Sequence, residues 1–388
     1  GNGDHQGSGR VGGDGVMASF DEVLKDCTKL GTKIPTNEYL KNGKYPVIDQ
    51  GQSDIAGYHD SDSGLFENVP AIVFGDHTRA VKYVDKPCFL GADGVKLLCP
   101  LDKDINCKYL FYQLSCADIP NTGYNRHFKW VKALNFKIPS SDEQNHVVEV
   151  LDKVTSLIFL RKQQLAKLDE LVKARFVEMF GEPVSNPYKF EVRSLQNMLD
   201  DGIITYHLDG NHGSDYPRNE EFVQTGIPYI SANCIVNGNI DFSLAKHLTK
   251  ERAKKLRKGI AQNGDVLFAH NATVGPVSIL HTDEEKVILG TSLTAYRCNK
   301  KVVLPPYLKC YMQSDGFVRQ YSKDMKQTTR NQVPITIQRK YLFMIPPLSL
   351  QNEFAAFVER VDQQKQTVQQ SLEKLELMKK ALMQEYFG

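Results

Sequence analysis

The sequence predicts an α+β fold of two mixed α/β blocks, each followed by a long helix, with the two helices paired as an antiparallel coiled coil of pseudo-two-fold symmetry. Two observations predict it. Residues 138–181 align without a gap with residues 345–388, and both segments carry an apolar repeat typical of a long helix. The segments before them, 17–137 and 182–344, are rich in Gly, Asn, Asp, aromatic and β-branched residues.

The chain begins with a Gly-rich segment, residues 1–16, that precedes Met17. Its composition is typical of a tag or vector remnant, so we expect it to lie outside the fold. The first block, 17–137, contains short strand-like runs such as Ala71-Ile72-Val73-Phe74, and its last short strand runs directly into the Ile-Pro at 138–139.

The first helical segment, 138–181, shares with 345–388 the opening Ile-Pro, a Gln-Asn pair (144–145 and 351–352) and the closing Phe-Gly. Each helix should start just after the Ile-Pro and end at the Gly, which closes a helix without steric cost. Each would span about 35–40 residues, or roughly 50–60 Å.

Apolar residues follow the alternating spacing of a coiled-coil seam in both helices. Arg161 and Lys365 interrupt it. The two stripes can bury each other, and the alternative is that each helix packs only on its own block. The seam residues are Val147, Leu151, Val154, Ile158, Leu165, Leu168 and Val172 in the first helix, and Phe354, Val358, Val361, Val368, Leu372, Leu375 and Leu382 in the second.

The second block, 182–344, opens with a linker in which Pro183 and Pro187 prevent helix continuation. It resembles the first block faintly. Pro228-Tyr229-Ile230 before a polar loop corresponds to Pro46-Val47-Ile48, and Tyr307-Leu308 corresponds to Tyr109-Leu110.

Composition narrows the function classes. With 388 residues the chain can form two ordinary domains, and a net charge of +2 means that any nucleic-acid surface must come from local clusters of Lys and Arg. The eight cysteines form no C-x-x-C pair, so we expect reduced thiols that pack as small hydrophobes rather than a zinc site. No run approaches about 18 apolar residues, which excludes a membrane span, and we expect a cytoplasmic protein.

The Ile-Pro, the glutamine after it, the long Leu/Lys/Glu helix and the terminal Phe-Gly of both copies resemble the specificity subunit of type I restriction-modification systems. The resemblance covers residues 17–388. It implies that 17–137 and 182–344 are target-recognition domains and that 138–181 and 345–388 are spacer helices. Each domain would read one half of a split DNA site, and the site should be asymmetric because the two blocks differ.

The resemblance also implies partners for a chain that is not itself an enzyme. They are double-stranded DNA, two methyltransferase (modification) subunits docked on the helices, and restriction subunits recruited through them, together serving DNA methylation and bacterial defence. The chain would need no cofactor, since S-adenosylmethionine, ATP and Mg²⁺ belong to the partner subunits.

Two reading domains at opposite ends of a rod formed by the two helices could reach successive major grooves of DNA, about 34–36 Å apart.

Two polar, cationic runs at equivalent positions before the helices are the strongest candidates for DNA contact, with solvated loops as the alternative. We expect removal of Arg126 or Arg330 to relax one half-site only, by about 1–3 kcal/mol. The predicted contacts are Tyr124, Asn125, Arg126, His127 and Lys129 in the first block, and Lys326, Gln327, Thr328, Thr329, Arg330 and Asn331 in the second.

Weaker candidates follow strands or lie in charged runs. The loops after the two matching Pro-x-Ile strands could read bases, and the loop 270–273 could be a contact or a plain turn. The basic run 250–258 could grip phosphates or be the solvated face of a helix. The residues are Gln50, Gln52, Ser53, Arg79, Lys82, Ser231, Asn233, Lys254, Lys255, His270, Asn271 and Thr273.

Enzymatic functions find little support. Leu304-Pro305-Pro306-Tyr307 resembles the (Asp/Asn/Ser)-Pro-Pro-Tyr loop of amino-methyltransferases, but Leu304 cannot hold an amino group, and we expect the prolines to start a helix. No P-loop occurs, and pairs such as Asp76-His77 lack the context of a metal site. A second class stays open: a coiled-coil scaffold or interaction protein without DNA readout, whose blocks would expose apolar rather than positive faces.

Overall fold

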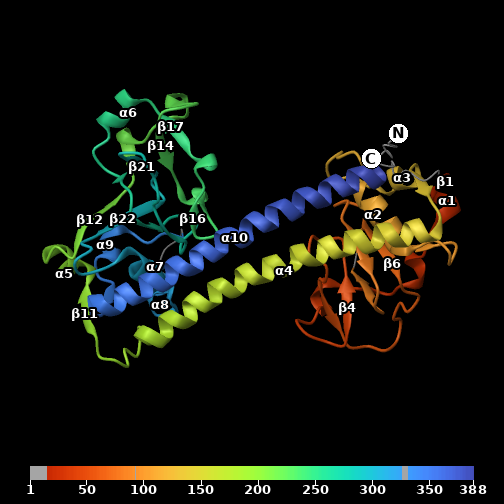
Figure 1. The fold of residues 1–388 in the computed structure, drawn as a ribbon, viewed down its shortest axis with the longest axis horizontal. Helices are drawn as coiled ribbons and strands as arrows, with labels where there is room; N and C mark the ends of the chain where they lie inside the picture. The colour runs from red at the N-terminus through yellow and green to blue at the C-terminus, as the bar shows by residue number, and fades with distance from the viewer. Residues whose placement is uncertain (1–14, 92, 326–330) are drawn as a thin grey trace, which may run out of the picture. The chain divides into compact units, whose positions relative to one another are not determined.

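The computed structural model describes residues 15–91, 93–325 and 331–388. The chain divides into two compact units (Figure 1). Unit 1 comprises Gly1–Lys162 and Gln369–Gly388, and unit 2 comprises Gln163–Val368. The division falls inside both long helices, α4 (Ser141–Phe180) and α10 (Leu348–Phe387), rather than at the block boundaries. Each unit therefore contains one block and a part of each long helix.

The block of unit 1 begins and ends in one antiparallel ladder. Strand β1 (Val16–Ser19) pairs with β10 (Asn135–Ile138), and Val16 lies opposite Ile138. Val16 was expected to lie in a vector remnant outside the fold. The prediction that residue 16 lies outside the fold is therefore corrected. Strand pairing uses backbone groups, so it does not depend on which segment Val16 comes from.

Two four-stranded sheets form the centre of unit 1. The first has the antiparallel order β2-β9-β6-β7, and the second, β3-β8-β4-β5, contains the parallel pair β4 and β8. All five residues of β6 are buried, because it is covered on both faces. The strands are β2 (Leu24–Asp26), β3 (Lys33–Ile34), β4 (Tyr45–Ile48), β5 (Gly57–His59), β6 (Ala71–Gly75), β7 (Val81–Val84), β8 (Phe89–Gly91) and β9 (Val95–Pro100).

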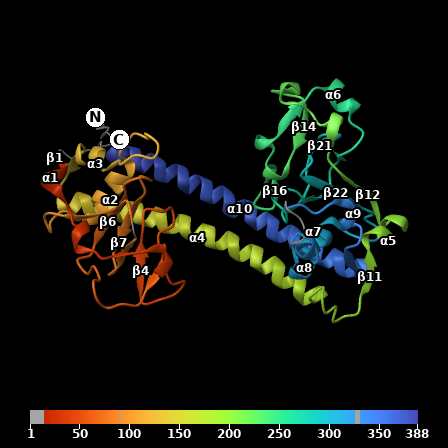
Figure 2. The same ribbon diagram turned by 180° about the vertical axis from the view of Figure 1, so that it is seen from behind.

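Three short helices cover the first sheet of unit 1: α1 (Phe20–Val23), α2 (Cys107–Cys116) and α3 (Phe128–Lys132). Helix α2 starts where the Asn106 side chain accepts hydrogen bonds from the backbone N–H groups of residues 108 and 109, which satisfies two free donors. Its buried Tyr109 and Tyr112 pack against Val147 and Leu151 of α4, so α2 lies between the sheet and the long helices (Figures 1 and 2).

Unit 2 repeats this arrangement with additions. The sheet β12-β22-β19-β20 matches β2-β9-β6-β7, the parallel pair β14 and β21 matches β4 and β8, and the ladder of β11 with β23 matches that of β1 with β10. The elements are β11 (Glu191–Ser194), α5 (Leu195–Asp200), β12 (Ile204–Asp209), β13 (Phe222–Val223), β14 (Ile227–Ile230), β15 (Ile235–Val236), β16 (Asn239–Ile240), β17 (Lys246–Leu248), α6 (Lys250–Lys255), β18 (Ile260–Ala261), β19 (Val266–Ala269), β20 (Val277–Ile279), β21 (Val287–Leu289), β22 (Leu293–Cys298), α7 (Pro305–Gln313), α8 (Asp315–Met325), α9 (Ile335–Gln338) and β23 (Leu342–Ile345).

The repeated glutamine has the same role in both units. The amide oxygen of buried Gln144 accepts the N–H of Asn106, the residue that caps α2, at 2.8 Å, and its Nε2 donates to the Pro139 carbonyl. The amide oxygen of buried Gln351 accepts the N–H of Leu304, at the start of α7, also at 2.8 Å. Each glutamine thus joins a long helix to the helix packed against it, which explains why the repeat retains it.

The two long helices contact each other within each unit. In unit 1 the Arg161 Nε donates to the Ser371 Oγ at 3.2 Å. In unit 2 the Lys365 Nζ lies 2.6 Å from Asp169 Oδ1, and the Phe354 ring packs on Phe176. The two polar residues that interrupt the predicted seam are therefore each engaged by the opposite helix. The seam residues predicted from the sequence are buried or half-buried.

Candidate nucleic-acid interface

Three polar segments of unit 1 lie together and form what we call loop cluster 1: residues 49–53 after β4, 76–79 after β6, and 122–127 before α3. The His77 backbone N–H donates to Gln50 Oε1 at 3.2 Å, and His77 Nδ1 lies 3.2 Å from the carbonyl oxygen of Asn125. Segments that are far apart in the sequence, each predicted separately to contact DNA, are thus joined by direct hydrogen bonds.

Exposed aromatic, amide and cationic side chains lie on loop cluster 1 and on the helix α3 that follows it. Tyr124 is 86% exposed and stacks on the His77 ring, with the ring centroids 4.6 Å apart and 7° between the planes. Asn125 and Arg126 are exposed beside it. Lys129, also exposed, lies over the Trp130 ring at 4.2 Å. Aromatic, amide and cationic groups on one surface can stack on bases, bond to base edges and neutralise phosphates.

Two residues predicted to contact DNA are instead buried beneath the loops. His127 is fully buried, and its Nδ1 lies 2.9 Å from the Asp76 carbonyl. Lys82 is buried, and its Nζ donates to the Ser53 carbonyl at 2.5 Å. The prediction that these two side chains contact DNA directly is wrong. Both are buried and bond to backbone carbonyls beneath the loops. Arg79 is half-buried and donates to the Ile119 carbonyl at 2.9 Å.

Unit 2 assembles an equivalent set, loop cluster 2: residues 231–234 after β14, 270–274 after β19, and 331–332 before α9. Ser292 joins the first two segments, since its hydroxyl accepts the N–H of Ala232 and its carbonyl accepts the N–H of His270. The Ala272 N–H donates to the Asn331 carbonyl at 3.0 Å. The predicted contacts Lys326, Gln327, Thr328, Thr329 and Arg330 lie outside the described residues.

The other predicted residues of unit 2 differ in exposure. Asn233, Thr273 and Asn331 are exposed, and Ser231 and Asn271 are half-buried. Lys254 and Lys255 are exposed on α6, which is capped by the Thr249 hydroxyl. In unit 1, Gln52 and Ser53 are exposed and Gln50 is half-buried. These DNA contacts stay predictions.

His270 is a further correction. It is 1% exposed, and its Nδ1 lies 2.8 Å from the Thr294 hydroxyl. Thr294 accepts a bond from the Gln338 amide, whose oxygen in turn accepts from the Tyr296 hydroxyl at 2.6 Å and lies 3.2 Å from His207 Nε2. This buried network supports loop cluster 2 from inside, so the His270 side chain is not on the outer surface of the loops.

The two buried imidazoles predict acid sensitivity of unit 2. Burial lowers the pKa of His207 and of His270 from 6.5 to about 4. Between pH 6.5 and pH 4 each of these histidines binds more protons in the unfolded chain than in the folded chain. The free energy of unfolding is therefore highest above pH 6.5 and decreases as the pH falls toward 4. The loss from pH 7.5 to pH 5 is about 2 kcal/mol per histidine.

Native-state hydrogen exchange of amides in β19 and β22, corrected for intrinsic exchange at the two pH values, checks this expectation for unit 2. His270→Gln should show a smaller difference in unfolding free energy between pH 7.5 and pH 5 than the unaltered chain. An equal difference in both proteins would contradict the role assigned to this imidazole.

Sequence reasoning considered His77 only as part of a metal site and did not predict its place at the centre of loop cluster 1. The signal was available, because His77 follows β6 at the position where Asn271 follows the matching strand β19. It also missed His212, a half-exposed residue whose Nε2 lies 2.7 Å from Asp209 Oδ2 after β12. Neither residue stands in a cationic run, so local composition did not mark them.

The other features singled out in the sequence have structural roles or belong to no cluster in the described residues. In residues 15–91, 93–325 and 331–388, no three His, Cys, Asp or Glu side chains converge as a metal site would require. Pro305 and Pro306 start α7 as predicted, and Tyr307 is buried with its hydroxyl bonded to the Met344 carbonyl. No helix among the described residues has the length and apolarity to cross a membrane. The eight cysteines are free, and burial raises the pKa of Cys88 to about 12.

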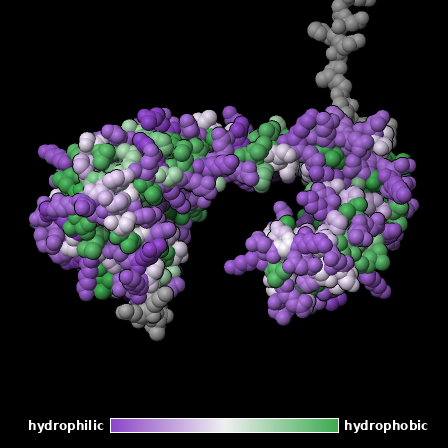
Figure 3. Space-filling view, turned by 90° about the horizontal axis from the view of Figure 1, so that it is seen from below, coloured by the Kyte–Doolittle hydropathy of each residue, from purple (hydrophilic) through white to green (hydrophobic). Residues whose placement is uncertain are grey.

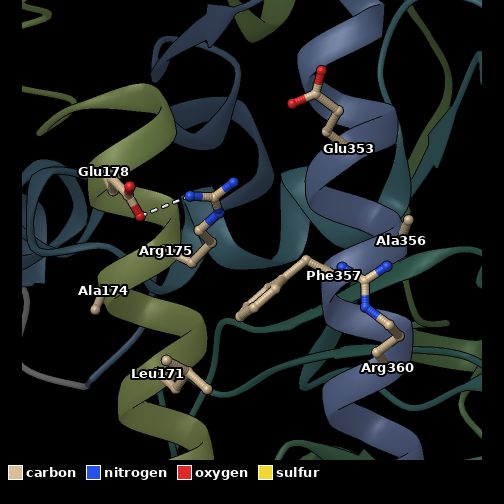
Figure 4. Close-up of a pocket in the computed structure, with 8 residues that line it drawn as sticks. All are labelled: Leu171, Ala174, Arg175, Glu178, Glu353, Ala356, Phe357 and Arg360. Carbon is tan, nitrogen blue, oxygen red and sulfur yellow. Dashed lines mark hydrogen bonds and ion pairs between the residues drawn. The ribbon is translucent and has the colours of Figure 1, made fainter.

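A groove of about 810 Å³ lies between α4 and α10 in unit 2 (Figure 4). Phe357 points across it from α10, and the Arg175 guanidinium of α4 lies 5.9 Å from the Phe357 ring centre and 2.8 Å from Glu178. The groove therefore combines an apolar floor with a charged rim. Its lining residues are Leu171, Ala174, Arg175, Glu178, Glu353, Ala356, Phe357 and Arg360.

Comparison with known families decides between the remaining classes. The model of the type I restriction modification DNA specificity domain matches residues 21–170 and 209–377, one match for each block and its helix. The chain belongs to this family. Specificity subunits of type I systems are non-catalytic recognition subunits, which agrees with the expected absence of a reaction centre.

Two curated relatives carry the same family name. A type I restriction enzyme specificity subunit of Methanocaldococcus jannaschii is 25% identical over 209 residues, which cover 52% of this chain and 46% of that protein. A type I restriction enzyme specificity subunit of Escherichia coli is 26% identical over 160 residues, or 37% of this chain and 40% of that protein. The aligned segments thus span less than half of each relative.

Solved structures show that the fold is shared over the whole specificity chain. The S subunit of a type I restriction-modification system from M. genitalium matches with a TM-score of 0.59 and 16% identity, covering 97% of both chains. A structure of a type I restriction-modification complex matches with a TM-score of 0.52 and 14% identity, covering 96% of this chain and 97% of that one. The fold is therefore that of a specificity subunit, with two mixed α/β target-recognition domains.

Proposed function

We propose that the chain reads a bipartite, asymmetric DNA site, with loop cluster 1 on one half and loop cluster 2 on the other. The observation that carries this proposal is that two equivalent loop sets stand on a duplicated frame but present different side chains. The equivalent frame supplies two readers, and the unequal side chains, such as Tyr124 in one and Asn331 in the other, supply two different half-sites.

The long helices would form the spacer between the readers as an antiparallel coiled coil with pseudo-two-fold symmetry. Support comes from the contacts within each unit. In unit 1, Leu151 of α4 shares a cluster with Leu382 of α10, whereas in unit 2 Phe176 of α4 packs on Phe354 of α10. The later residue of α4 thus meets the earlier residue of α10, as in an antiparallel pair. The pairing of Lys365 with Asp169 would help to fix the register, since a polar seam residue favours one alignment.

The helices would also dock the methyltransferase subunits. Apolar residues interrupt the hydrophilic surface (Figure 3), and on α4 of unit 1 Leu157, Phe159 and Leu160 are exposed. The groove at Phe357 adds a concave apolar floor in unit 2. The 207-residue offset of the repeat places Val150 of α4 at the position equivalent to Phe357. Two related surfaces would take two methyltransferase subunits, and restriction subunits would join through them.

No cofactor of its own is proposed for the chain. S-adenosylmethionine would be bound by the methyltransferase partners, and ATP with Mg²⁺ by the restriction subunits. The proposed role of this chain is to determine where those partners act.

Replacement of Arg126 tests the assignment of loop cluster 1. Arg126→Ala is expected to cost about 1–3 kcal/mol in discrimination at a few positions of one half-site, because an exposed guanidinium that bonds a base edge is lost. Methylation of duplexes that carry every single substitution in both halves measures it. Lys103→Ala is the matched control, since it removes an exposed cation in the turn after β9, whereas loop cluster 1 lies at the other end of that strand, where the Gly94 carbonyl accepts the Asp76 N–H. Equal tolerance of substitutions in both halves by Arg126→Ala would contradict the assignment.

A further inference from the structure

The tip of the predicted reading loop in unit 1 is held by the His77 imidazole, whereas the buried His127 imidazole contacts the base of the loop, with its Nε2 3.4 Å from the Thr122 Oγ1. Residues 123–126 form their own turn, in which the Asn125 N–H donates to the Gly123 carbonyl at 2.8 Å and the Asn125 Nδ2 donates to the Thr122 carbonyl at 2.5 Å. The His77 ring joins this turn to the rest of loop cluster 1 twice, through Nδ1 to the Asn125 carbonyl and through its face to Tyr124. Because a carbonyl oxygen only accepts, Nδ1 must carry the hydrogen.

The other side of His77 is fixed against the protein. A Cβ at Gly94 would lie 2.7 Å from the His77 ring and 2.6 Å from Gln50 Oε1, so the absence of a side chain at position 94 lets both groups lie against the backbone. The Thr78 hydroxyl donates to the Gln50 carbonyl at 2.6 Å. The ring therefore lies close to the Gly94 backbone and stacks on the exposed Tyr124.

In unit 2 the described residues 331 and 332 are joined to the segment after β19 in a different way. Asn271, at the position equivalent to His77, forms a backbone bridge with Gln332, and the next residue bonds to the Asn331 carbonyl. Main-chain pairing there does not depend on the side chain at 271. Both clusters share one backbone bond, from the His127 N–H to the Asp76 carbonyl in unit 1 and from the Val333 N–H to the His270 carbonyl in unit 2, and they differ in the next link, which is the His77 side chain in unit 1 and the backbone in unit 2.

We propose that His77 is the positioning residue of loop cluster 1, which places Tyr124, Asn125 and Arg126 and so sets how strictly the first half-site is read. This inference rests on the proposed function. It also states an asymmetry: the side chain at 77 matters for one half-site, whereas the side chain at 271 matters little for the placement of the other loop.

The test uses the full chain assembled with its methyltransferase subunits. The rate of methylation is measured on duplexes that carry the mapped site and every single base substitution in each half. His77→Ala should reduce discrimination at the first half-site about tenfold, the effect of losing one hydrogen bond and one ring stack, and leave the second within about twofold. His77→Phe keeps a ring under Tyr124 and should restore most of the discrimination.

Matched variants separate positioning from general stability. His59→Ala removes an imidazole of the same unit that also has one backbone hydrogen bond, at 3.2 Å to the Ser61 N–H, and one ring contact, at 5.0 Å to Phe89. It should leave discrimination unchanged. Tyr124→Ala alters an exposed residue, so folding is not at risk, and it should relax the same half-site as His77→Ala. Asn271→Ala should change neither half-site by more than about twofold.

Several outcomes would overturn the inference. Unchanged discrimination at the first half-site in His77→Ala and Tyr124→Ala would do so, as would an equal loss in both halves shared by His59→Ala. These results would leave the proposed function in place. An unaltered chain that methylates without sequence preference would overturn the proposed function, and this inference with it.

Discussion

Replacing Phe354 with alanine is expected to lower the free energy of unfolding of unit 2 by about 3–5 kcal/mol. Phe354 is fully buried, and its ring packs edge-on against Phe176 at 5.7 Å and Phe180 at 5.4 Å. Truncation leaves a cavity where two helices and the block meet, and aromatic neighbours on rigid helices cannot collapse into it.

Native-state hydrogen exchange of amides in β19 and β22 measures this effect for unit 2 alone, which avoids treating a chain of two units as one cooperative transition. Leu377→Ala on the same helix is the control. Its side chain is 69% exposed, so the expected change is within about 0.5 kcal/mol. Equal changes in both variants would contradict the anchoring of α10 to unit 2 through Phe354.

Replacing Phe357 with glutamate is expected to weaken docking of one methyltransferase subunit by at least about 30-fold, the effect of losing a central apolar contact and burying a charge. Phe357 lies at the centre of the groove between α4 and α10. Val150→Glu at the equivalent position should weaken docking of the other subunit, and the double variant should bind neither.

The mass of complexes formed at increasing methyltransferase concentration measures docking in each variant. Glu359→Ala is the control, because Glu359 is exposed on α10 and does not line the groove. Two methyltransferase subunits bound at unaltered affinity to the double variant would show that these surfaces are not the docking sites.

The repeat made the long helices predictable. A 44-residue helical segment leaves a periodic record in the sequence, and the residues assigned to its seam are the ones buried or half-buried in the structure. The shared glutamine at 144 and 351 was visible as an identity. Its role was not, because it depends on contacts with the backbone at 106 and 304, about 40 residues away or more.

Local composition located the loops but not the direction of each side chain. His127, Lys82 and His270 stand in polar segments, as a contact residue would, yet each turns inward to satisfy carbonyl or hydroxyl groups beneath the loop. Exposed Arg126 and buried His127 are adjacent in the sequence. Which of two neighbouring polar residues faces solvent is decided by tertiary partners, here Asp76, and these are not encoded nearby in the chain.

The structural role of His77 was not predicted for a related reason. That role arises from three segments that meet only in the folded unit, where the loops after β4 and β6 are joined although the two strands belong to different sheets. Comparing the residues that follow matching strands in the two blocks identifies it, since the fold is duplicated even where the sequence has diverged. Structural equivalence within a repeat is thus a better guide to positioning residues than charge.

Mapping of modified adenines tests the account most directly. The chain is co-expressed with its methyltransferase subunit in a host without DNA methylation, and modified positions are identified by sequencing. The account predicts one split, asymmetric motif with two short defined halves and a fixed gap, and exchange of residues 182–344 for those of a relative should change one half only. A complex that assembles but leaves DNA unmodified, or modifies it without a split motif, would contradict it and favour a scaffold.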